Sequence, residues 1–193
     1  MKTDYNKLMK QEISGFGVKP RLLLHCCCAP CSSAVIERIS EFFDITYFYY
    51  NPNIYPEEEY TRRQSEFKKL GVQVLDEGYN HEDFLKVAKD LAEEKEGGAR
   101  CQRCIALRLM RTFEYAVENG YEVVSTTLSI SPHKDAEFIN TLGSAFEKKY
   151  GVKFLHADFK KENGFLRSIQ ISKEKGIYRQ EYCGCEFARN NEE

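Results

Sequence analysis

The sequence predicts an α/β domain of the Rossmann-like, doubly wound type, with about five parallel strands and an irregular cysteine-containing C-terminal tail. Two observations support this prediction. Short apolar runs alternate with longer segments of helical periodicity in the order βαβαβααβαβα, which is typical of a parallel sheet with helices on both faces. The length of 193 residues suits one domain, so we treat residues 1–193 as a single unit.

The first half of the chain supplies three strands and three helices. Each strand is a short apolar, aromatic or β-branched run, and each helix carries apolar residues three and four positions apart. The strands are expected at 21–25, 44–50 and 72–75, and the helices after the capping residues Ser32 and Ser33, from Pro56 to Gly71, and over 81–96.

The second half continues the alternation. Gly97-Gly98 ends the preceding helix and leads into the next one. Helices are expected at 101–119, 134–150 and near 165–175, and strands at 121–127 and 152–156. Ligands of such a sheet bind beyond the carboxyl ends of its strands, where the strand order reverses.

Eight cysteines are the most distinctive feature of the chain. They form three groups: Cys26-Cys27-Cys28 with Cys31, Cys101 with Cys104, and Cys183 with Cys185. Clustered thiols in a reducing compartment favour metal or redox chemistry over disulfides, and consecutive cysteines are a poor way to fill a core. We therefore expect one thiolate-rich pocket, built from three segments, that binds zinc or an iron–sulfur cluster.

The first group lies where a strand passes into a helix, in the segment HCCCAPCSS. The helix N-terminus lowers the pKa of nearby thiols, so redox cysteines, a nucleophile and metal ligands all remain open. Consecutive side chains alternate in direction, so the three adjacent cysteines cannot all face one pocket. We assign Cys26, at the strand end, a structural role.

The other two groups are suited to sharing a centre. Cys101 and Cys104 are three residues apart and lie on one helix face, which Arg108 and Arg111 continue. The glycine between Cys183 and Cys185 lets both sulfurs turn to one point. Four such thiolates complete a [4Fe–4S] cluster or a zinc site, and the surplus cysteines favour iron because structural zinc needs only four ligands.

Three other residues are weaker candidates. His25, at a strand end, is expected to be structural, whereas His133 lies in a loop and is either solvated or catalytic. Asp158 follows the fifth predicted strand. It would serve as a hard ligand or proton carrier in the pocket, or else pair with Lys160 or Lys161.

Charge and hydropathy restrict the location and the partners. The net charge is −2, but residues 100–111 and 160–179 are basic and flank cysteine motifs. These stretches are either solvated helix faces or a surface for a polyanion such as RNA. The first twenty residues lack an apolar stretch, and no run approaches the roughly 20 apolar residues of a membrane span. We therefore expect a cytoplasmic protein with no membrane partner.

Five segments give the chain a family resemblance. They are LLLHCCCAPCSS, YNPNIYPEEEYTRR, GGARCQRCIALRL, STTLSISPHK and IYRQEYCGCEFAR. In order and spacing they resemble the QueH family of epoxyqueuosine reductases, over nearly the whole chain from about residue 20. The resemblance implies the HUP-like variety of the Rossmann fold. It also implies an oxidoreductase that removes the epoxide oxygen of epoxyqueuosine in tRNA by two-electron reduction, the last step of queuosine biosynthesis.

The resemblance further implies a [4Fe–4S] cluster and a second metal ion, expected to be iron. Carried onto this sequence, it makes Cys101, Cys104, Cys183 and Cys185 the cluster ligands, and Cys27, Cys28 and Asp158 the catalytic residues that hold the second metal. The partners would be tRNA carrying epoxyqueuosine at the wobble position and an external electron donor. The division of the cysteines between the two centres stays open, and the resemblance assigns no role to Cys26 or Cys31.

Two alternatives belong to other classes. A related tRNA thiolation enzyme would bind ATP, but the sequence has no glycine-rich phosphate loop. A non-enzymatic zinc module would bind nucleic acid through its basic segments. A brown colour after anaerobic purification distinguishes an iron–sulfur enzyme from a zinc module.

Overall fold

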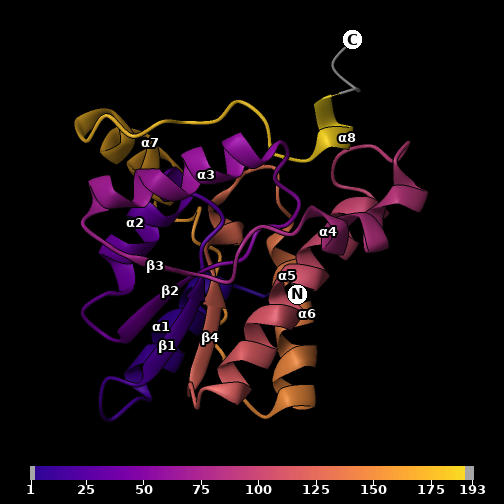
Figure 1. Ribbon diagram of the computed structural model, residues 1–193. Coiled ribbons are helices and arrows are strands. Elements are labelled where there is room, and N and C mark those ends of the chain that lie inside the picture. Colours follow the sequence, from indigo (N-terminus) through magenta and orange to yellow (C-terminus); the bar gives the residue numbers. More distant parts are fainter. Residues whose placement is uncertain (1–2, 190–193) are drawn as a thin grey trace.

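The computed structural model describes residues 3–189. Five parallel strands form one sheet in the order β3-β2-β1-β4-β5, with helices on both faces (Figure 1), so the expected α/β class is confirmed. This order reverses direction between the neighbouring strands β1 and β4. The strands are β1 Arg21–His25, β2 Asp44–Tyr49, β3 Val74–Asp76, β4 Val123–Thr126 and β5 Lys153–Phe154.

Eight α-helices and three 3-10 helices lie in the described part of the chain. They are α1 Tyr5–Ser14, α2 Ala29–Ile39, α3 Glu57–Ser65, η1 Glu66–Leu70, α4 His81–Ala88, η2 Lys89–Leu91, α5 Ala99–Glu118, η3 Thr127–Ile130, α6 Ala136–Tyr150, α7 Gly164–Glu174 and α8 Glu186–Arg189. None of these helices combines the length and apolar character that crossing a membrane requires.

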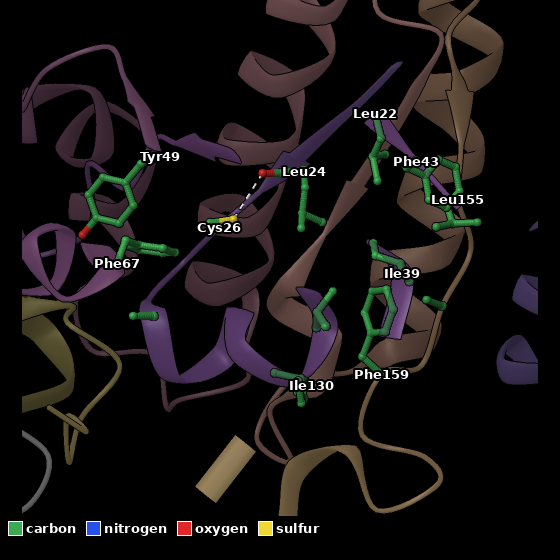
Figure 2. Packing of buried hydrophobic residues seen from close by; sticks show 14 of the residues in the cluster. Leu22, Leu24, Cys26, Ile39, Phe43, Tyr49, Phe67, Ile130, Leu155 and Phe159 are labelled. Atoms are coloured by element: carbon green, nitrogen blue, oxygen red, sulfur yellow. Dashed lines mark hydrogen bonds between the residues drawn. The ribbon is translucent and has the colours of Figure 1, made fainter. Parts of the chain in front are cut away.

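The central strand β1 is buried on both faces. Leu22 and Leu24 belong to a core with residues of α2 and α7, whereas Leu23 belongs to the core with α5 and α6 on the opposite face. Figure 2 shows Leu22 and Leu24 in the first of these cores, with Ile39 of α2 nearby. A strand covered on both faces needs apolar residues at successive positions, which explains the continuous run in the sequence.

The helix after β1 begins earlier than expected. Cys28 is the N-cap of α2, and its Sγ accepts a hydrogen bond from the Cys31 backbone N–H at 3.3 Å. Ser32 and Ser33 lie inside the helix, and their hydroxyls donate to the carbonyls of Cys28 and Pro30. The prediction that these serines cap the helix is therefore wrong, because a thiol takes that position.

Other boundaries also differ from the sequence predictions. Helix α1 was not expected; it packs through Met9 into the first core. The helix expected up to Gly71 ends as the 3-10 segment η1. The helix expected over 81–96 ends at Ala88, and η2 follows it. Arg100 donates hydrogen bonds to the carbonyls of Leu91 and Ala92, at the end of η2 and just beyond it.

Gly143 of α6 tests the packing of the second core. A methyl group at this position would lie 2.3 Å from ring atoms of Phe154. Alanine normally stabilises a helix relative to glycine by about 1 kcal/mol. Here we expect Gly143→Ala to lower the free energy of unfolding by about 1–3 kcal/mol, because overpacking forces the ring or the helix to move. Urea denaturation measures the difference. Gly17→Ala, with no atom within 4 Å of the added group, is the control.

Candidate metal centre

A cavity of about 80 Å³ lies where the strand order reverses, beyond the carboxyl ends of β1 and β4. It has room for several water-sized groups. The lining includes Cys27, which follows β1, and Leu128, which follows β4. Cysteines of all three groups line it, namely Cys27, Cys31, Cys101, Cys104, Cys183 and Cys185. The predicted convergence of three distant segments on one pocket is confirmed.

The first group brings three thiols together. The Sγ atoms of Cys27, Cys28 and Cys31 all lie within 4.8 Å of one another, a spacing at which one metal ion could be bound. Within residues 3–189, no other trio of cysteine, histidine or carboxylate ligand atoms meets this spacing. Sequence reasoning gave Cys31 no role. Its placement follows from the N-cap geometry of Cys28, because the first turn of α2 returns residue 31 to the cap.

The three thiols share their protons unequally. Hydrogen bonds with Cys28 and Cys31 hold the pKa of Cys27 well below its usual range, and Thr127 adds a third such contact. Burial raises the pKa of Cys28 to about 12, and the interaction with Cys27 raises that of Cys31. The trio is thus arranged to hold one thiolate before a metal ion displaces the other two protons.

Helix α5 provides the second group at its first turn. The Gly97 backbone N–H donates to Cys101 Sγ at 3.2 Å, and burial raises the pKa of Cys104. Cys104 packs with Phe84, Ala88 and Cys185 in a small apolar cluster. The second and third cysteine groups therefore meet at one wall of the cavity.

The third group lies on a tail that is held mainly by polar contacts. The buried Arg63 guanidinium donates to the carbonyls of Tyr182 and Cys183 at 3.2 and 3.1 Å, and its Nε forms an ion pair with Glu59 at 2.7 Å. The Tyr55 N–H donates to the Gly184 carbonyl at 2.9 Å. These contacts hold an irregular segment against the end of the sheet.

Gln180 joins the tail to the first group. Its Nε2 donates to Cys28 Sγ at 3.0 Å, and its Oε1 is buried without a hydrogen-bond partner among the described residues. Gln180 also lines the cavity. The sequence gave no signal for this contact, because a single glutamine in an irregular segment has no periodic or motif context.

The structural roles assigned to Cys26 and His25 are confirmed. Cys26 is fully buried in the first core, and its Sγ donates to the Leu24 carbonyl (Figure 2). The His25 Nε2–H donates to the Tyr50 carbonyl, so Nδ1 accepts from the Thr126 hydroxyl at 2.9 Å. Burial lowers the pKa of His25 to about 4, which keeps the ring neutral.

Asp158 lies outside the cysteine-lined cavity. It lines a separate hollow of about 860 Å³ and forms an ion pair with Lys160 at 2.8 Å. Lys134 lines both hollows, so the two spaces adjoin. His133 is exposed and is absent from the cavity lining. The ligand role of Asp158 stays a prediction.

The basic segment 100–111 does not form the surface that its sequence suggested. Arg100 and Arg108 are buried and line the cavity, so a solvated or RNA-facing role for these two is wrong. Arg111 was expected beside the thiols, but it forms ion pairs with Glu77 and Glu118. Helical spacing shows that these arginines share one face of the helix. It does not show which of them the neighbouring elements bury.

Comparison with known proteins gives the family. The model of the family described as Epoxyqueuosine reductase QueH matches residues 22–191. The chain belongs to the QueH family. Curated relatives named Epoxyqueuosine reductase QueH include those of Streptococcus pyogenes (42% identity, 97% of this chain and 78% of the relative) and Thermotoga maritima (40% identity, 86% and 89%).

A solved structure shares the fold. It is a predicted subunit of tRNA methyltransferase from Methanocaldococcus jannaschii, with a TM-score of 0.53 and 14% sequence identity. The match covers 84% of this chain and 93% of that one. At this identity the likeness concerns the fold alone, and it agrees with the doubly wound arrangement described above.

Gly184 tests how the third group is placed. Its φ is +103°, and a methyl group there would lie 2.9 Å from Arg63 Nη1 and 3.0 Å from Ile54. We expect Gly184→Ala to displace both flanking cysteines and to lower the metal bound per chain several-fold, as measured by elemental analysis after anaerobic purification. Gly176→Ala is the control, because its φ is also positive but no atom lies within 4 Å. Equal metal content in both variants would contradict the placement.

Proposed function

We propose that the protein is an epoxyqueuosine reductase that converts epoxyqueuosine in tRNA to queuosine. The observation that carries this proposal is the convergence of three cysteine groups on the switch-point cavity of a QueH family member. The proposal accounts for a cavity that is rich in thiols and that lies where folds of this type bind their ligands.

The reaction sets clear chemical requirements. Removing the epoxide oxygen breaks two C–O bonds and forms a C=C bond. The balance needs two electrons and two protons, and the oxygen leaves as water. An external electron donor must supply the two electrons.

The donor set fits a thiolate-bound iron centre. Seven thiols lie in or at the cavity, and no aspartate or glutamate of residues 3–189 lines it. We assign Cys101, Cys104, Cys183 and Cys185 to a [4Fe–4S] cluster, and Cys27, Cys28 and Asp158 to a second metal ion, iron, with Cys31 as a further thiol ligand. When bound by these residues, the iron centres would supply single electrons and a Lewis acid for the epoxide oxygen.

The remaining residues prepare the site. Ile54, Phe84 and Leu128 give the cavity apolar walls, which limit the access of water. Arg63 and Gln180 hold the tail in place over the first cysteine group. Lys161, Lys173 and Lys175 are exposed, and we assign them to contacts with phosphates of the tRNA.

A direct assay tests the function. Anaerobically purified protein is incubated with a chemical reductant and tRNA that carries epoxyqueuosine, and mass spectrometry of the nucleosides detects the loss of one oxygen. We expect conversion by a brown, iron-containing protein. A colourless protein that contains only zinc and converts no substrate would sink the proposal.

Cysteine variants test which thiols act. We expect Cys28→Ala and Cys101→Ala to lower conversion at least 100-fold, since each removes a thiol that we assign to an iron centre. Cys26→Ala is the matched control: this thiol faces the first core, so iron content and conversion should remain near those of the unmodified protein. Full conversion by Cys101→Ala contradicts the assignment of the cluster.

Asp158→Asn tests the predicted carboxylate ligand. If the carboxylate leaves Lys160 to bind the second metal, the amide should lower conversion at least tenfold and lower the iron per chain, with the cluster absorption retained. Lys160→Met controls for the ion pair alone. If conversion and iron content are unchanged in Asp158→Asn, or if Lys160→Met causes an equal loss, the role of Asp158 is limited to its ion pair with Lys160.

A further inference from the structure

Four cationic side chains line the thiol cavity, and no carboxylate of the described residues does. Arg63, Arg100 and Arg108 have 2%, 1% and 5% of their surface exposed, and Lys134 is largely covered. Cations are rarely buried to this extent without partners. The question is therefore which anions compensate them.

Two of the four cations have carboxylate partners outside the lining. Arg63 pairs with Glu59 at 2.7 Å, and Lys134 pairs with Glu96 at 3.3 Å. Neither carboxylate is among the residues that line the cavity. The charges of these two side chains are thus compensated within the protein.

Arg100 and Arg108 are not compensated in this way. In the described part of the chain, their hydrogen bonds go to neutral groups: Arg108 donates to the Cys104 carbonyl and to Asn51 Oδ1 at 3.3 and 3.4 Å, and Arg100 donates to two carbonyls. The Nε and Nη2 of Arg100 are buried and have no hydrogen-bond partner among these residues. An arginine stays charged at any pH a protein tolerates, so two positive charges remain open toward the cavity.

We propose that Arg100 and Arg108 are the counter-charges of a thiolate–iron centre in this cavity, and that Arg108 raises the reduction potential of that centre. This inference rests on the proposed function. A [4Fe–4S] core in its 2+ state with four thiolates carries a charge of about −2, and the two guanidinium groups offset it. The thiols are the only acidic groups of the described lining that can supply this negative charge.

The position of Arg108 explains its assigned role. It follows Cys104 by four residues on α5, so one rigid helix holds both the ligand and the cation. Its Nε donates to the carbonyl of Cys104 at 3.3 Å, and its guanidinium lines the cavity together with thiols of all three cysteine groups. A fixed positive charge in a low-dielectric cavity favours the electron-rich state of a nearby centre. The centre then accepts electrons from the donor more readily.

Substitutions of Arg108 separate charge from shape. Arg108→Met removes the charge and keeps much of the apolar stem, whereas Arg108→Lys keeps the charge. Arg103→Met is the matched control, because Arg103 lies on the same helix but is half exposed and pairs with Asp90. Iron per chain and midpoint potential are measured by elemental analysis and anaerobic spectroelectrochemical titration. We expect a more negative potential in Arg108→Met, and potentials close to that of the unmodified protein in Arg108→Lys and Arg103→Met.

A second variant covers the case in which Arg108→Met fails to assemble the centre. Asn51→Asp puts a carboxylate beside the intact Arg108, so it should also make the potential more negative. Loss of iron in Arg108→Met with retention in Arg108→Lys supports the counter-charge role. An unmoved potential in Asn51→Asp, or in an iron-loaded Arg108→Met, overturns the inference.

The two proposals can fail separately. If the unmodified protein holds iron and converts epoxyqueuosine, but the midpoint potential does not change with the charge at position 108, only the counter-charge role is wrong. If the unmodified protein holds iron and converts no substrate under any reductant, the proposed function is wrong, and the potentials still decide the electrostatic inference.

Discussion

The buried guanidinium of Arg63 connects the C-terminal tail to helix α3, where its ion pair with Glu59 holds it in place, and this wall of the thiol cavity depends on it. The guanidinium is buried, so water does not compete for its N–H groups. Its Nη1 and Nη2 donate hydrogen bonds to the carbonyls of Cys183 and Tyr182. The tail between α7 and α8 has no regular structure that would hold it otherwise. Without this guanidinium, the third cysteine group would lose two of the hydrogen bonds that fix its backbone, and the Tyr55 N–H bond to the Gly184 carbonyl would remain.

The walls of the cavity therefore differ in how they are supported. The first thiol group lies between β1 and the first turn of α2, and the second lies on α5. These elements belong to the two apolar cores, so the thiols keep their positions as long as the domain is folded. The tail depends on polar contacts and on one small apolar cluster around Phe84. Segments with few buried apolar contacts open at a lower free energy than the global unfolding of the domain. We therefore expect the tail to open at a lower free energy than the two walls formed by the core elements.

The sequence predicted the framework better than the details of the site. Strands that are covered on both faces leave continuous apolar runs, and the carboxyl-end rule places the first cysteine group at the ligand-binding edge. The convergence of the other two groups on it was expected from the clustering of the thiols, not from their places in the fold. The role of Cys31 could not be predicted, because it depends on a thiol at the N-cap of α2. The burial of Arg100 and Arg108 could not be predicted either: helical spacing identifies a shared face, but charged residues usually lie on the solvated one.

Helix α5 carries both the proposed thiol ligands and the proposed counter-charge. The residues at positions 101, 104 and 108 of α5 lie along one face of two successive turns, so their relative positions do not change when the tail moves. A counter-charge on the tail would move away from the thiolates whenever the tail opened. A counter-charge on α5 keeps its distance from Cys101 and Cys104 throughout. In the proposed centre, the placement of Arg108 on α5 would therefore keep its charge at a constant distance from Cys101 and Cys104 even where the tail opened.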